Sequence, residues 1–203
     1  MSSSIIKEEV KTVKNELFNN NKMWLDSGAQ WISKPEYEHD GNIYLRFIKD
    51  INLEKIDGAL KVRMTGFSKY QFYINGELIT RGPAACDVSY TVYHEYSIPA
   101  EKLLPGQNRI GVLLFHEGWS VDTIQKFHYY KAGLLMWIEY GSYKWVSDDT
   151  WKVSVSTCYS RTASLVSKWG TYKQYYHGEN EEPWQFPDFD ATNWSNASTF
   201  SPA

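Results

Sequence analysis

The chain has 203 residues, which is enough for one sizeable domain or two small ones. Its hydrophobic share of 42% and charged share of 22% are those of an ordinary globular protein, whereas aromatic residues reach 16%. Because each aromatic side chain carries a large area that folding can bury, the composition excludes a disordered chain. The formal charge of -3 argues against a nucleic-acid partner, and no apolar run is long enough to cross a membrane.

The two cysteines, Cys86 and Cys158, are too few for a disulfide framework and lack the CxxC spacing of a metal site. We expect two free thiols, with a single bridge as the alternative. Residues 1–9 contain no basic region followed by an apolar core, so they do not form a secretory signal. A cytoplasmic protein is therefore expected, and the N-x-S patterns at Asn193 and Asn196 are chance matches.

Residues 1–22 are predicted to form an N-terminal helical segment, with the helix over residues 5–18. Its apolar residues recur at three- and four-residue steps, the spacing of one helix face: Ile6, Val10, Val13 and Leu17. Glu8 and Glu9 would then lie in the first turn, where the helix dipole favours acidic groups. This helix either packs on its own domain or docks on a partner.

In residues 23–203 the apolar residues recur at every second position, and strand-like runs are joined by turn signals. Asn75-Gly76 separates two such runs and predicts a hairpin, because a type I′ turn needs positive φ at both central residues. Residues 109–115 are almost continuously apolar, which predicts a central strand buried on both faces. Residues 134–140 and 143–146 predict a second hairpin around Gly141-Ser142.

Many short strands with regular turns predict an all-β fold, a jelly-roll β-sandwich preceded by the short helix. Residues 176–203 are rich in Asp, Glu, Asn and Pro, so we expect a loop-rich tail that wraps the sandwich.

Enzyme signatures are absent from the sequence, which has no GxSxG, phosphate-binding GxxxxGK[ST] or HExxH pattern. His116-Glu117 is the nearest acid/base pair, but neighbours on a strand point to opposite faces and converge only if a loop turns there. The acidic pairs and clusters at Asp148-Asp149 and residues 179–182 are expected to be solvated turns rather than the facing carboxylates of a glycosidase.

Residues 81–96 and 115–131 combine aromatic rings with Arg, Asp, Glu and His, the composition of a sugar site at the rim of a sandwich. The alternative is that these aromatic residues anchor the core or the loops.

Several short motifs follow one another in a characteristic order. They are Trp31-Ile32, Leu45-Arg46-Phe47, residues 73–77, Arg81-Gly82-Pro83, residues 104–112, Gly118-Trp119, Tyr140-Gly141, residues 147–152 and residues 186–194. Together they span residues 24–200, and their order resembles the N-terminal β-sandwich of bacterial α-L-rhamnosidases. The resemblance implies a galactose-binding-like jelly roll that binds sugar or supports a catalytic domain. It also implies a missing part, since that family hydrolyses its substrate in an (α/α)6 barrel, and this chain shows no helical array.

We therefore expect a non-catalytic module of a rhamnosidase-like glycoside hydrolase, either a natural fragment or a piece of a longer protein. Its expected partners are a carbohydrate, such as one containing L-rhamnose, and the catalytic domain of the parent chain. The alternative is a purely structural domain without sugar affinity. No cofactor or metal is expected, because no Asp/Asn-rich calcium loop is found.

The expected sugar contacts come from both polar-aromatic regions: Arg81, Asp87, Tyr90, His116, Glu117 and Trp119. In this hypothesis Trp119 stacks on the sugar ring, Arg81 and His116 donate hydrogen bonds, and Asp87 and Glu117 accept them.

Overall fold

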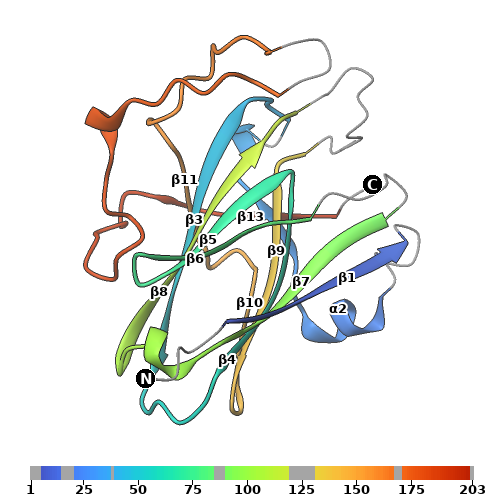
Figure 1. Cartoon of the computed structure of the whole chain (residues 1–203), viewed down its shortest axis with the longest axis vertical. Coiled ribbons are helices and arrows are strands. Elements are labelled where there is room, and N and C mark those ends of the chain that lie inside the picture. The colour runs from blue at the N-terminus through green and yellow to red at the C-terminus, as the bar shows by residue number, and fades with distance from the viewer. Residues whose placement is uncertain are drawn as a thin grey trace.

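Two antiparallel sheets packed face to face form the protein (Figure 1). This computed structural model describes residues 6–14, 21–37, 39–84, 90–118, 131–166 and 171–201. The predicted all-β sandwich is confirmed. None of the described helices is long and apolar enough to span a membrane.

The seven-stranded sheet has the order β1-β7-β4-β9-β2-β13, with β10 paired to β9. Its strands are β1 (Lys7–Lys14), β2 (Trp31–Ser33), β4 (Leu60–Phe67), β7 (Tyr90–Ile98), β9 (Gly133–Tyr140), β10 (Tyr143–Val146) and β13 (Ser198–Phe200). The six-stranded sheet has the order β12-β11-β3-β8-β5-β6. Its strands are β3 (Ile43–Leu53), β5 (Lys69–Ile74), β6 (Glu77–Gly82), β8 (Gly106–His116), β11 (Lys152–Val155) and β12 (Ser195–Asn196). The helical elements are α2 (Lys22–Ser27) and three 3-10 turns, η1 (Pro35–Tyr37), η2 (Ala100–Lys102) and η3 (Gly178–Asn180).

The predicted N-terminal helix is wrong for the described residues, since Lys7–Lys14 form the edge strand β1. β1 pairs with β7 over its whole length, and the Glu8 carboxylate lies 2.5 Å from Nδ1 of His94. Val10, assigned to the apolar helix face, is 49% exposed. Tertiary pairing therefore overrides the helical spacing. The described helix is α2, which begins later, capped by the Asn21 side chain.

Both predicted hairpins are present. Asn75 and Gly76 have φ values of 51° and 85°, as a type I′ turn between β5 and β6 requires. β9 and β10 form the second hairpin, with Gly141 at a φ of 56°. β8 lies between β3 and β5 and is buried from Asn108 to His116, which confirms the predicted central strand.

The main core lies between the inner faces of the two sheets. Trp151 is fully buried there, and its indole Nε1 donates a 2.8 Å hydrogen bond to the carbonyl of Val146. A second aromatic cluster covers the outer face of the six-stranded sheet. It joins strand residues such as Tyr44 and Phe115 to Trp184 and Trp194 of the C-terminal segment. From Tyr176 to Ser201 this C-terminal segment is mostly loop and runs along the sandwich (Figure 1).

Candidate functional site

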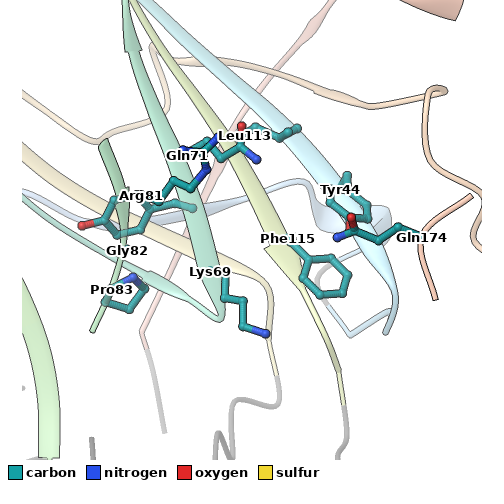
Figure 2. A pocket seen from close by; sticks show the side chains of 10 residues that line it. Tyr44, Lys69, Gln71, Arg81, Gly82, Pro83, Leu113, Phe115 and Gln174 are labelled. Atoms are coloured by element: carbon teal, nitrogen blue, oxygen red, sulfur yellow. The ribbon is translucent and has the colours of Figure 1, made fainter. Parts of the chain in front are cut away.

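A cavity of about 330 Å³ opens on the outer face of the six-stranded sheet (Figure 2). We call it the outer groove. Its lining residues come from four neighbouring strands, the segment after β6 and the C-terminal segment: Tyr44, Lys69, Tyr70, Gln71, Arg81, Gly82, Pro83, Leu113, Phe115 and Gln174.

The sheet register builds the floor of the outer groove as two rows of side chains. Arg81 of β6 lies opposite Gln71 of β5, which lies opposite Leu113 of β8. Lys69 of β5 lies opposite Phe115 of β8, which lies opposite Tyr44 of β3. Because residues two apart on a strand share a face, the two rows lie side by side, about 7 Å apart. Arg81 therefore lies at one end of the groove and Tyr44 at the other (Figure 2).

Stacked rings form the apolar wall of the groove. The Tyr44 ring lies 4.4 Å from that of Phe115 and 3.8 Å from that of Tyr159, both stacked. Nε2 of Gln174 donates a 2.7 Å hydrogen bond to the Tyr44 hydroxyl. Burial raises the pKa of Tyr44 to about 12. The hydroxyl therefore keeps its proton at neutral pH and can donate it to a ligand.

Side-chain donors dominate the rest of the lining. Nζ of Lys69 lies 3.0 Å from a carboxylate oxygen of Glu117, and Gln71 Oε1 accepts a 2.5 Å hydrogen bond from the Tyr73 hydroxyl. Arg81 is exposed, and its guanidinium has no acidic partner among the described residues. No Asp or Glu belongs to the described lining of the groove. The groove therefore carries an excess of positive charge.

Of the predicted sugar contacts, Arg81 lines the outer groove. Glu117 is not part of the lining, but it forms an ion pair with the groove residue Lys69. Glu117 follows the end of β8, and its side chain is only 14% exposed. Asp87 and Trp119 lie outside the described residues.

The structure does not bring His116 or Tyr90 to the groove. The predicted donor His116 is 1% exposed and lies on the inner side of β8, with Nδ1 3.1 Å from the carbonyl oxygen of Phe67. Tyr90 begins β7 in the seven-stranded sheet. Alternation along the strand explains the position of His116, because Phe115 and His116 of β8 must face opposite sides. Tyr90 is separated from the groove because it belongs to the other sheet.

Several groove residues were not among the predicted sugar contacts: Tyr44, Lys69, Gln71, Leu113, Phe115 and Gln174. The alternation Lys69-Tyr70-Gln71 places two polar side chains on one face and is a signal that the sequence contains. Gln174 gives no such signal, since it reaches Tyr44 from 130 positions away along the chain. Within the described ranges, no cluster of three or more His, Cys, Asp or Glu side chains is placed to hold a metal ion. Cys158 is a buried free thiol, and Cys86 lies outside the described residues.

The fold and this groove define a β-sandwich whose one outer face carries a cavity lined by aromatic, aliphatic and hydrogen-bonding side chains. No family model and no curated protein sequence matches the chain. Solved structures do match. A GH78 family rhamnosidase of Bacillus sp. GL1 superposes with a TM-score of 0.71 and 24% identity, over 86% of this chain and 18% of that one. The α-L-rhamnosidase of Dictyoglumus thermophilum gives a TM-score of 0.65 and 26% identity, over 90% of this chain and 22% of that one. A lectin from Pleurotus ostreatus gives a TM-score of 0.58 and 18% identity, over 87% of this chain and 42% of that one.

The predicted resemblance to α-L-rhamnosidases is thus confirmed at the level of structure. The similarity covers nearly the whole chain and is consistent with an N-terminal β-sandwich domain of such enzymes. The chain spans only about a fifth of the length of these two rhamnosidases.

Proposed function

We propose that this chain is a non-catalytic, carbohydrate-binding module of an α-L-rhamnosidase-like glycoside hydrolase, and that the outer groove is its sugar site. The observation that carries the proposal is the lining of the groove. It combines a wall of aromatic and aliphatic side chains with amide, hydroxyl and guanidinium donors. The similar structures support this, because they are rhamnosidases and a lectin.

Sugar recognition needs an apolar surface for the C–H faces and a few directed hydrogen bonds. Leu113 and Phe115 supply the apolar surface, while Arg81, Gln71 and the Tyr44 hydroxyl supply donors. A volume of about 330 Å³ lies at the lower end of the range for small-molecule sites, so the groove suits a single sugar or the end of a chain.

Binding rather than hydrolysis is proposed because glycosidases use two carboxylates that face each other across the substrate. The described lining of the groove holds neither of them. In this proposal catalysis belongs to another domain of the parent chain, and this module holds carbohydrate near it. Purified chain should release no rhamnose from an aryl rhamnoside; measurable release would contradict the proposal.

A structural role without sugar affinity is the second candidate, and one surface favours it. The segment from Cys158 to His177 exposes large apolar side chains, including Leu165, Val166 and Tyr176. Val166 is 61% exposed. Such a surface can pack on the catalytic domain.

The deciding experiment is a calorimetric titration of the chain with L-rhamnose, galactose and other sugars, with and without calcium. Arg81→Ala should weaken binding by about tenfold or more, because it removes a charged donor from the groove. Its melting temperature should stay unchanged, since the Arg81 side chain is exposed. Lys61→Ala is the control, as it removes an exposed lysine from β4 in the other sheet. A flat titration with every sugar would leave only the structural role.

A further inference from the structure

The charge of the outer groove restricts which sugars it can accept. Lys69 and Arg81 both line the groove, whereas its described lining contains no Asp or Glu. Sites for neutral sugars commonly use carboxylates to accept hydrogen bonds from sugar hydroxyls, because a carboxylate offers acceptors only. Here Lys69 and Arg81 offer only donors, and Gln71 and Gln174 supply the amide acceptors.

The guanidinium of Arg81 is the group best placed to bind a ligand's charge. Arg81 is exposed at one end of the groove, and no described acidic side chain pairs with it. This differs from the other arginines whose partners are known: Arg46, Arg63, Arg109 and Arg161 each form an ion pair with a carboxylate. A guanidinium presents a planar fork of donors that matches a carboxylate in a bidentate geometry.

Lys69 is different, because Glu117 already neutralises it in part. The Lys69 ammonium lies 3.0 Å from the Glu117 carboxylate and 5.9 Å from the centre of the Phe115 ring. Its side chain is 43% exposed and lines the groove, so a ligand there can reach it. Glu117 thus reduces the positive potential of the groove from just outside its lining.

We infer that the saccharide accepted by the outer groove is anionic, a sugar with a carboxylate such as a hexuronate. This inference rests on the proposed function. The carboxylate would pair with Arg81, and the ring would extend along the groove toward Leu113 and Phe115, where its C–H face meets the apolar wall. The sugar hydroxyls would meet Gln71, Gln174 and the Tyr44 hydroxyl.

The test compares matched sugars that differ in one group. Galacturonate and galactose share their ring hydroxyls, and only the first carries a charge. At about 20 mM salt we expect galacturonate to bind about tenfold more tightly than galactose, and the difference to shrink at about 200 mM salt, where exposed charges are screened. Acetate serves as the probe for the anion alone. Galactose 6-sulfate tests whether another anionic group can replace the carboxylate.

Two variants link the preference to the residues. Arg81→Gln should remove the preference for galacturonate while leaving weak binding of galactose. Glu117→Gln should strengthen galacturonate binding several-fold, because it frees the charge of Lys69 without changing the side-chain size. A gain of affinity cannot come from damage to the fold, so this variant separates the electrostatic role from a structural one. Lys61→Gln in the other sheet is the control for net charge. It should change neither the affinity for galacturonate nor that for galactose.

Each outcome decides a separate question. Tighter binding of galacturonate than of galactose, lost in Arg81→Gln, supports the inference, whereas a preference for galactose 6-sulfate over galacturonate overturns the choice of a carboxylate. Equal affinity for galactose and galacturonate overturns it and leaves the proposed function standing. Acetate binding as tight as galacturonate binding also overturns it, because the sugar ring then contributes nothing. No binding of any sugar removes both the inference and the proposed function.

Discussion

The imidazole of His116 is held neutral inside the protein. It is 1% exposed, and its Nδ1–H donates to the carbonyl of Phe67 at 3.1 Å. Its Nε2 has no hydrogen-bond partner among the described atoms. Burial lowers the pKa of His116 to about 4, against the ordinary 6.5. A residue that the sequence offered as a sugar contact is therefore a pH-sensitive element of the core.

His116 should make the fold less stable in mild acid. Between about pH 6.5 and pH 4 the unfolded imidazole binds a proton and the folded one does not, so falling pH favours unfolding. The contribution across this window is on the order of 3 kcal/mol. His116→Asn keeps a donor for Phe67 and should flatten this part of the pH dependence.

Urea unfolding at several pH values measures the effect. Other groups titrate in the same window, so the informative quantity is the difference in slope between the variant and the parent chain. His177→Asn is the control, because the side chain of His177 is 46% exposed. Parallel stability curves for His116→Asn and the parent chain would show that the buried imidazole does not act in this way.

At the scale of elements, two buried arginines fasten the C-terminal segment to the six-stranded sheet. Arg109 binds both carboxylate oxygens of Asp50 and donates to the carbonyls of Trp184 and Phe189 at 3.1 and 3.2 Å. Arg46 forms a 2.6 Å ion pair with Glu182, and its guanidinium lies 4.8 Å from the Trp194 ring. The loop segment is thus held by side chains of β3 and β8 rather than by strand pairing alone.

Arg109→Met should loosen this segment. Methionine matches the length of the arginine side chain but has no donor, so the carbonyls of Trp184 and Phe189 lose their hydrogen bonds. We expect a loss of about 1–3 kcal/mol, because the buried hydrogen bonds to the two carbonyls are lost while Asp50, 40% exposed, stays solvated. Amide hydrogen exchange should accelerate at residues 184–189. Lys102→Met is the control, because Lys102 pairs with the exposed Glu77 and should contribute at most about 1 kcal/mol. Unchanged exchange at residues 184–189 would mean that aromatic packing alone holds the segment.

The elements that could be predicted from sequence are those fixed by local chemistry. Asn75-Gly76 fixes the β5–β6 hairpin, and the apolar run at 109–115 predicts its own burial. β1 could not be assigned from its residues, since its partner β7 lies about 80 positions later and the apolar spacing also fits a helix. The outer groove could not be predicted in full for the same reason, because its residues are distant in the sequence. Arg81 was found by its residue type, but its neighbours depend on the register of four strands.

At the scale of the whole molecule, the two sheets are joined where the chain passes Trp151. The backbone carbonyl of Trp151 accepts a 2.8 Å hydrogen bond from the amide of Ala197. Ala197 lies between β12 of the six-stranded sheet and β13 of the seven-stranded sheet. The indole itself is fully buried in the core that both sheets share. We therefore expect the sandwich to unfold as one cooperative unit.

Trp151→Phe tests this coupling. The smaller ring leaves a cavity and removes the donor of the Val146 carbonyl, so the free energy of unfolding should fall by about 2–4 kcal/mol. Trp145→Phe is the matched control, since Trp145 is only partly buried and should cost less. Urea unfolding followed by far-UV circular dichroism and by tryptophan fluorescence should give one midpoint in each variant. Two separated transitions in Trp151→Phe would show that the two sheets unfold independently of each other and that Trp151 stabilises only one of them.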